Sequence, residues 1–188
     1  MKPKKNDAIF DISSDQYLNC PRELITHLTH LLKLYFSHGF VPETLLLCTL
    51  YPLLKDNLRD ITASSNYRAI ACGCLLLKLI DLVILVLEGD KLSYDSMQYA
   101  YQVKSSTTIC NWSVTAVVDH FNRKGAPVFS AAMSKAFDMV KWQELFTTLV
   151  DRTVDALFLH LILYIYMNQK CNDSWCGNFS ETFSDKAL

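Results

Sequence analysis

The sequence of 188 residues lacks several of the patterns that assign an enzyme class directly. It contains five glycines, and none of them forms a glycine-rich phosphate loop or the tight turn that presents a nucleophilic serine in hydrolases. No two aspartates are adjacent, and His and Cys do not cluster at metal-ligand spacing. These absences argue against a P-loop nucleotidase, a serine hydrolase and a zinc enzyme.

An excess of charge of one sign is also missing. Eighteen Lys and Arg residues stand against nineteen Asp and Glu residues, and the formal net charge is −1. Nucleic-acid-binding domains are usually basic, so any basic surface on this chain must be a local patch.

Apolar runs long enough to cross a membrane are not found. The run 75–87 contains Lys78 and Asp81, and the run 156–167 contains His160 and has too few residues. No apolar segment follows the polar residues 1–7, as it would in a secretory signal. We therefore predict no membrane partner and an intracellular protein, with no signal that selects nucleus or cytoplasm.

The seven cysteines are odd in number, and most of them lie in apolar stretches. Neither the spacing of Cys72 and Cys74 nor that of Cys171 and Cys176 is usual for a zinc site, and no pair of histidines follows. We predict free, buried thiols in a reducing compartment and no bound metal.

Hydrophobic residues make up 51% of the chain and charged residues 20%, as expected of a globular protein. We divide the sequence into a polar leader (1–20) anchored through Phe10 and Ile12, a second region (21–125) and a third (126–188). Hydrophobic periodicity and turn residues predict the individual elements. The expected helices are 22–37, 75–87, 108–122, 142–149 and 154–169, with a short helix running into a strand over 44–54, a loop over 56–67, a strand over 128–133 and a hairpin within 171–184.

One pentapeptide in the third region carries the most information. It follows the apolar stretch 128–133 and consists of Ser134, Lys135, Ala136, Phe137 and Asp138. The segment resembles motif A of the reverse transcriptases of non-LTR (LINE-type) retrotransposons, in which an apolar strand leads to Asp, any residue, and Ser-Lys-Ala-Phe-Asp. The first Asp of that motif binds the catalytic metals. Here Ala132 takes its place, or a two-residue deletion next to Met133 has removed it.

Further blocks resemble the same family in the same order. Residues 52–56 and 66–70 resemble its fingers region, and 75–81 the helix that follows. Residues 98–101 and 105–108 resemble the block leading to the palm, and 163–169 with Trp175 and Phe183 the helix and hairpin before motif B. The resemblance covers nearly the whole chain. It implies an α/β (α+β) fold: the helix-rich fingers and an incomplete palm of a right-hand polymerase.

The resemblance also implies nucleotide-binding residues. Lys55 and Arg68 resemble fingers residues that neutralise the triphosphate, and Arg can grip phosphate bidentately. Phe137 would pack under the sugar and exclude a 2′-hydroxyl. The alternatives are a solvated Lys55, a surface salt bridge for Arg68 and a core role for Phe137. Asp138 would be a helix cap or a structural residue, and Lys135 a solvated or nucleic-acid-facing one.

Three polar residues and one histidine are candidates for a functional role, but each has a simpler structural interpretation. Gln98, Ser106 and Thr107 are interpreted as local hydrogen-bonding and capping residues rather than template contacts. His160 is interpreted as an ordinary histidine on a helix, because no Asp, Cys or second His lies at ligand spacing.

Catalysis by this family needs carboxylates that hold two Mg²⁺ ions about 3.5–4 Å apart. The family takes one Asp from motif A and two from a later Asp-Asp turn, and this sequence has neither. Ala100 and Lys104 also replace glycines of the family pattern. We predict no catalytic residues, no bound cofactor and an inactive chain.

Three alternatives to an inactive remnant are open. The first is a domesticated module that binds RNA or an RNA–DNA hybrid without catalysis. The second is an all-helical interaction protein, for which the hairpin and the strand 128–133 should both be absent. The third, an unrelated enzyme, has no motif in its favour. An incomplete palm further predicts an open sheet edge and self-association through exposed palm surface.

Overall fold

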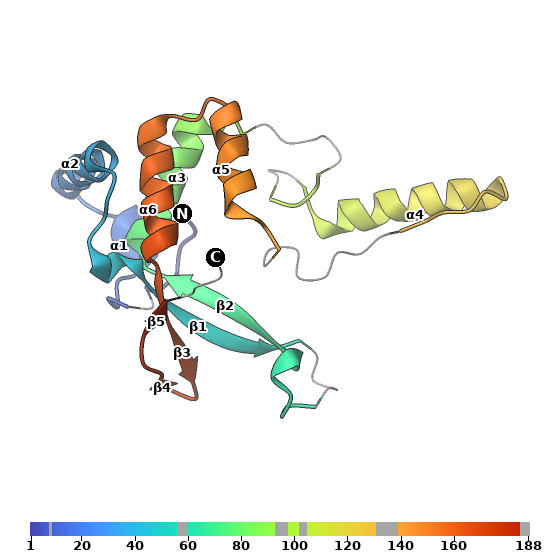
Figure 1. Ribbon diagram of the computed structural model, residues 1–188, viewed down its shortest axis with the longest axis horizontal. Helices are drawn as coiled ribbons and strands as arrows, with labels where there is room; N and C mark the ends of the chain where they lie inside the picture. Colours follow the sequence, from blue (N-terminus) through green and yellow to red (C-terminus); the bar gives the residue numbers. More distant parts are fainter. Residues whose placement is uncertain (8, 56–59, 93–97, 102–104, 131–138, 185–188) are drawn as a thin grey trace. The chain divides into compact units, whose positions relative to one another are not determined.

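A computed structural model describes residues 1–7, 9–55, 60–92, 98–101, 105–130 and 139–184 (Figure 1). The chain forms two compact units. The first comprises residues 1–91 and 142–188, and the second residues 92–141. Helices and a small mixed sheet occur together, so the predicted α/β class is confirmed and an all-helical fold is excluded.

The first unit holds the sheet and most of the helices. Its helices are α1 (Ser14–Leu18), α2 (Arg22–His38), α3 (Leu75–Glu88), α5 (Trp142–Asp151) and α6 (Ala156–Asn168), with 3₁₀ turns η1 (Glu43–Leu46) and η2 (Ser64–Asn66). Its strands are β1 (Leu47–Leu54), β2 (Tyr67–Gly73), β3 (Lys170–Trp175), β4 (Asn178–Phe179) and β5 (Phe183–Ser184). The described helix of the second unit is α4 (Thr107–Arg123).

Most of the predicted elements are confirmed. The five predicted helices correspond to α2, α3, α4, α5 and α6, and the short helix that runs into a strand is η1 followed by β1. The predicted hairpin is β3–β4, in which Cys176 and Gly177 both have positive φ, at 50° and 82°. Two positive φ values in a two-residue turn match the twist of the flanking strands.

The strands differ from the prediction in two places. Residues 68–71 lie in β2, whereas no strand is predicted between the loop 56–67 and the helix 75–87. Most side chains of β2 are exposed, so its sequence does not alternate between apolar and polar residues. Its backbone pairing with β1 defines the strand. In the expected strand 128–133, Val128–Ser130 has no regular secondary structure, and 131–133 lie outside the described residues. No strand among the described residues pairs with Val128–Ser130, and an unpaired segment gains nothing from an extended form.

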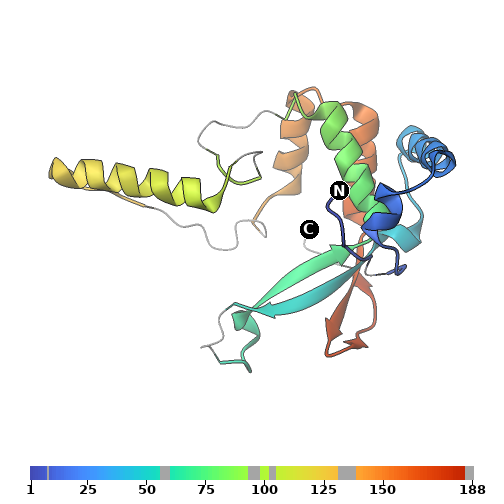
Figure 2. The same ribbon diagram turned by 180° about the vertical axis from the view of Figure 1, so that it is seen from behind.

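The sheet joins segments that are distant in the sequence. Its strand order is β2-β1-β3-β4, and β5 also pairs with β3. β1 runs antiparallel to β2 from Cys48↔Gly73 to Leu54↔Tyr67 and parallel to β3 from Leu47↔Lys170 to Leu50↔Asp173. The outer half of β1 is therefore paired with β2 alone, and the two strands form a ribbon that reaches away from the helices (Figures 1 and 2).

The core lies where α2, η1, α3 and α6 meet. Leu46, Ile80 and Leu161 each have no exposed surface. Phe36 of α2 meets Phe158 of α6 edge to face, with ring centroids 4.8 Å apart. The core thus lies at one end of the sheet, and the β1–β2 ribbon extends beyond the helices of this unit (Figure 1).

The N-terminal segment is attached by polar contacts and by Ile9, which packs against the core. The Asp7 carboxylate is buried and accepts a hydrogen bond from the backbone N–H of Leu75, the first residue of α3, at 2.6 Å. Ser14, also buried, accepts one from the N–H of Lys5 at 2.9 Å. The expected anchor Phe10 is 42% exposed. The segment is therefore held through its polar groups and through Ile9, and Phe10 contributes less than expected.

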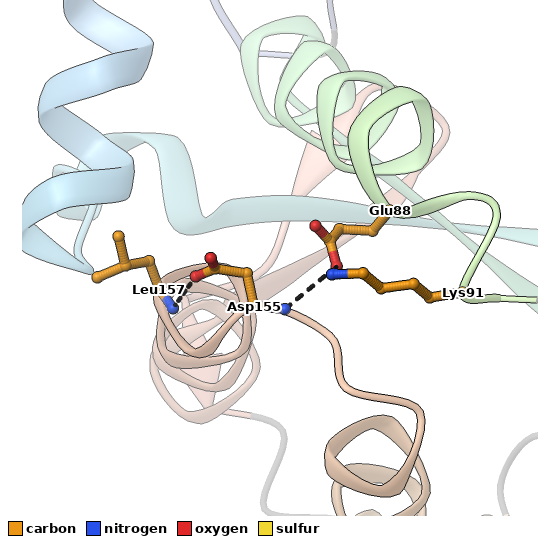
Figure 3. Close-up of polar contacts among 4 residues, drawn as sticks. All are labelled: Glu88, Lys91, Asp155 and Leu157. Atoms are coloured by element: carbon orange, nitrogen blue, oxygen red, sulfur yellow. Dashed lines mark hydrogen bonds and ion pairs between the residues drawn. The ribbon is translucent and has the colours of Figure 1, made fainter.

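A buried carboxylate connects the end of α3 to the start of α6. Glu88 Oε2 lies 2.8 Å from Lys91 Nζ and accepts a hydrogen bond of 3.1 Å from the backbone N–H of Asp155 (Figure 3). Asp155 in turn caps α6, because its Oδ1 accepts from the N–H of Leu157 at 2.8 Å.

We expect Glu88→Ala to lower the free energy of unfolding by about 2 kcal/mol, since it removes two charge-assisted hydrogen bonds at a buried position. Glu88→Gln retains an oxygen that can accept from Asp155 and should recover about half of the loss. Urea unfolding of both variants measures the difference. Equal losses would show that the packing of the side chain matters and its hydrogen bonds do not.

Gly39 ends α2 in a left-handed conformation, with φ of 70°, and lies against His160 of α6. A Cβ at this position would overlap the imidazole, with Cε1 only 2.7 Å away. His160 is exposed, as expected of an ordinary histidine on a helix, but it limits position 39 to glycine.

We expect Gly39→Ala to cost about 2 kcal/mol, of which about 1 kcal/mol is the left-handed strain of any residue with a Cβ. Gly177→Ala is the matched control, because Gly177 also has positive φ and open space around it. Thermal unfolding should show the larger loss for Gly39→Ala, and His160→Ala should restore part of it. A loss as small as that of Gly177→Ala would mean that the imidazole moves aside freely.

Candidate nucleic-acid interface

The far end of the β1–β2 ribbon carries Lys55, which directly follows β1. Its backbone N–H donates to the carbonyl of Asn66 at 2.8 Å and so extends the ladder by one pair. Its Nζ donates to the carbonyl of Ser65 at 2.7 Å. The exposed ammonium is thereby held against the 3₁₀ turn η2, with donors left for another ligand.

Arg68 lies on the same face of the ribbon as Lys55. Arg68 is paired with Leu53, and Lys55 is two residues beyond Leu53, so the alternation of side chains places both cations on one face as diagonal neighbours. Arg68 is exposed, and its guanidinium has no hydrogen bond or ion pair within the part of the chain that the structure describes. The salt bridge considered for Arg68 is not found there, and its guanidinium is available to a phosphate.

An aromatic pair occupies the opposite face of the ribbon. Tyr67 and Trp175 of β3 meet with ring centroids 5.3 Å apart and an interplanar angle of 65°. The Tyr67 hydroxyl donates to the carbonyl of Ile61 at 2.9 Å, which ties the ring to the residues before η2. Trp175 remains 53% exposed. The pair was not predicted as a site, because it becomes visible only when β2 is recognised as a strand beside β1.

An acidic residue limits the positive charge of this end of the ribbon. The Asp60 carboxylate accepts hydrogen bonds from the hydroxyl and backbone N–H of Thr62, and these hold its pKa below the ordinary value. Asp60 thus remains ionised at neutral pH. The basic patch formed by Lys55 and Arg68 is small, as expected of a chain that has no net basic charge.

The other predicted site residues belong to the second unit or lie outside the described residues. Gln98, Ser106 and Thr107 belong to the second unit, where Ser106 caps α4 by accepting from the N–H of Ile109 at 3.3 Å. Gln98 donates a long hydrogen bond of 3.5 Å to the carbonyl of Ala100. The capping role of Ser106 is confirmed. The motif A positions all lie outside the described residues: Ala132, Met133, Ser134, Lys135, Ala136, Phe137 and Asp138.

The cysteines are free thiols, and Cys48, Cys74 and Cys171 are buried. Cys48 of β1 and Cys171 of β3 are paired in the parallel ladder, and their thiols are hydrogen-bonded. Burial, followed by the neighbouring Cys171, raises the pKa of Cys48 to about 12, so the thiol stays protonated and unreactive. Among the described residues, no group of three or more His, Cys, Asp or Glu side chains is placed to hold a metal ion.

Apolar side chains are exposed on α5 and α6. A shallow groove of about 470 Å³ runs between α5 and α6. It is lined by Trp142, Gln143, Phe146, Val150, Leu159, His160, Leu163 and Met167. Val150 and Met167 are 59% and 61% exposed.

Comparisons with known proteins leave the family open. No protein-family model matches this sequence, and no curated protein sequence matches it significantly. None of the described helices is long and apolar enough to span a bilayer.

Proposed function

We propose that this chain corresponds to the fingers and the start of the palm of a non-LTR retrotransposon reverse transcriptase domain, and that it does not catalyse RNA-directed DNA synthesis. The observation that carries the proposal is the pentapeptide Ser134–Asp138, which matches motif A but has no carboxylate before it. The mixed α/β class and the helix–strand order around β1 agree with a fingers region.

The missing carboxylate supports the inactive part of the proposal. Two-metal phosphoryl transfer depends on carboxylates that bridge both ions. In the proposed correspondence Ala132 takes the place of the first Asp, or a two-residue deletion next to Met133 has removed it. Asp138, the one acidic residue in the pentapeptide, follows Phe137 and is not a metal ligand in the family pattern.

A second candidate function is binding of RNA or an RNA–DNA hybrid without catalysis. The observation that favours it is the shared face of Lys55 and Arg68 at the exposed end of the ribbon. Two cations that are diagonal neighbours can contact successive phosphates of one strand, and Trp175 nearby offers a stacking surface on the other face.

Primer extension on an RNA template, with Mg²⁺ or Mn²⁺, tests the first proposal, and we expect no product. Extension that persists through purification and is lost in Asp138→Ala would overturn the inactive assignment. Salt-dependent RNA binding on the same preparation tests the second candidate.

We expect Lys55→Gln/Arg68→Gln to reduce the slope of log affinity against log salt by about 1.4, or roughly 0.7 for each lost contact to a single-stranded phosphate. Arg22→Gln/Lys33→Gln is the charge-matched control, because it removes one Arg and one Lys from exposed positions of α2. Identical slopes for the two double variants would show that the ribbon is not the binding surface.

A further inference from the structure

Within the described residues, β2 forms one edge of the sheet and has no strand on its outer side. Among the residues that the structure describes, only β1 pairs with it. The Lys55 N–H donates to the Asn66 carbonyl, so these two residues form a hydrogen-bonded pair of the antiparallel ladder. Every second residue of β2 from there (Arg68, Ile70 and Cys72) therefore directs its backbone N–H and C=O groups to β1. The N–H and C=O groups of the intervening residues point outward: those of Ala69, Ala71 and Gly73, together with the Tyr67 carbonyl.

This edge has little of the usual protection against pairing. Natural edge strands carry charged side chains or Pro, contain a bulge, or are very short. β2 contains no Pro, its pairing with β1 is uninterrupted, and Arg68 is its one charged residue. Ala69 and Ala71 are exposed, and a Cβ built on Gly73 would meet nothing within 4 Å. The opposite side of the sheet differs, because β4 and β5 there have two residues each.

We propose that the outer edge of β2 binds the β2 strand of a second copy of this chain, antiparallel, about a twofold axis at Ile70. The outward backbone groups of one copy then meet those of the other, and two sheets become one. This inference is independent of the proposed function.

The composition of β2 selects this register. Ile70 is its middle residue, so a twofold axis there pairs the whole strand and places the two Ile70 side chains opposite each other. Arg68 lies opposite Cys72 of the second copy, whereas an axis at Arg68 would oppose two like charges. Tyr67 lies opposite Gly73 of the second copy, and glycine has no side chain there that could clash with it.

In this register Ala69 of each copy lies opposite Ala71 of the other copy. Ala69→Lys/Ala71→Lys and Ala69→Glu/Ala71→Glu therefore oppose like charges twice, and Ala69→Lys/Ala71→Glu opposes unlike charges twice. Both alanines are exposed, so all three variants should fold. Sedimentation velocity over a range of protein concentrations measures the dimer dissociation constant.

We expect the wild-type chain to dimerise and both like-charge variants to raise the dissociation constant about tenfold, with the unlike-charge variant at or below the wild-type value. Weakening by both like-charge variants excludes an effect of net charge, since one adds positive and the other negative charge. A wild-type chain that is monomeric throughout, or equal dissociation constants for all three variants, would overturn the inference. Circular dichroism and thermal unfolding of each variant confirm that the monomer fold is retained.

Discussion

Replacing Asp7 with alanine is expected to lower the free energy of unfolding by about 3 kcal/mol, since hydrogen bonds to charged groups contribute roughly 1.5–3 kcal/mol each and several are lost together. The carboxylate accepts from the N–H groups of Ile9 and Phe10 at 2.7 and 3.0 Å and from that of Leu75 at 2.6 Å. It thus closes a turn in the N-terminal segment and caps α3 at the same time.

The position at the start of α3 increases the expected loss. The first N–H groups of a helix have no partner within the helix, and the positive end of its dipole favours an anion. The N-cap residue Cys74 supplies a thiol that accepts from the N–H of Leu77 at 3.4 Å, and sulfur is a weak acceptor. Without Asp7, the N–H of Leu75 would be buried and unpaired.

Urea unfolding of Asp7→Ala, Asp7→Asn and Asp90→Ala separates charge from hydrogen bonding. Asp7→Asn keeps one acceptor and should show an intermediate loss. Asp90 is exposed, so Asp90→Ala should change stability by no more than about 0.5 kcal/mol. If Asp7→Ala were as stable as Asp90→Ala, the N-terminal segment would not contribute to the fold.

Leu161→Ala is expected to cost about 3 kcal/mol, within the range found when a buried leucine is reduced to alanine and leaves a cavity. Leu161 lies on α6 with no exposed surface and belongs to the cluster that contains Leu46 and Ile80. The loss combines the burial of the removed carbons with the contacts that the surrounding side chains no longer make.

Leu157→Ala is the matched control for this prediction, because it makes the same change on the same helix at a residue that is 50% exposed. We expect it to cost less than about 1 kcal/mol, with similar dependence on urea concentration in both variants. Equal losses would indicate that α6 does not pack against the core as described.

The helices could be predicted from the sequence because each buries one stripe of side chains. Leu32 of α2 and Ile80 of α3, for example, recur in phase with apolar neighbours toward one core. β2 could not be predicted in this way, because its side chains are largely exposed and its strand form depends on pairing with β1. The local hydrophobic pattern of a sequence indicates which side chains are buried, but it does not identify the strand with which a segment pairs.

The candidate site was predictable to a similar extent. Lys55 and Arg68 were identified by their resemblance to fingers residues, but their shared face follows from the register of β1 and β2. The roles of Asp7 and Glu88 had no local signal, because each depends on a backbone N–H more than sixty residues away, at Leu75 and Asp155. Contacts of that kind become visible only in three dimensions.

The position of β1 between β2 and β3 has a consequence for synthesis on the ribosome. β2 follows β1 closely, so their hairpin can form early, whereas β3 begins at Lys170. At about 5–20 residues per second, the interval between the end of β1 and the end of β3 is roughly 6–24 s. We expect the side of Leu47–Leu50 that later pairs with β3 to remain open on the nascent chain throughout this interval. Chaperone crosslinking to stalled nascent chains should therefore be strong before β3 emerges and weak afterwards, and unchanged crosslinking would contradict this order of assembly.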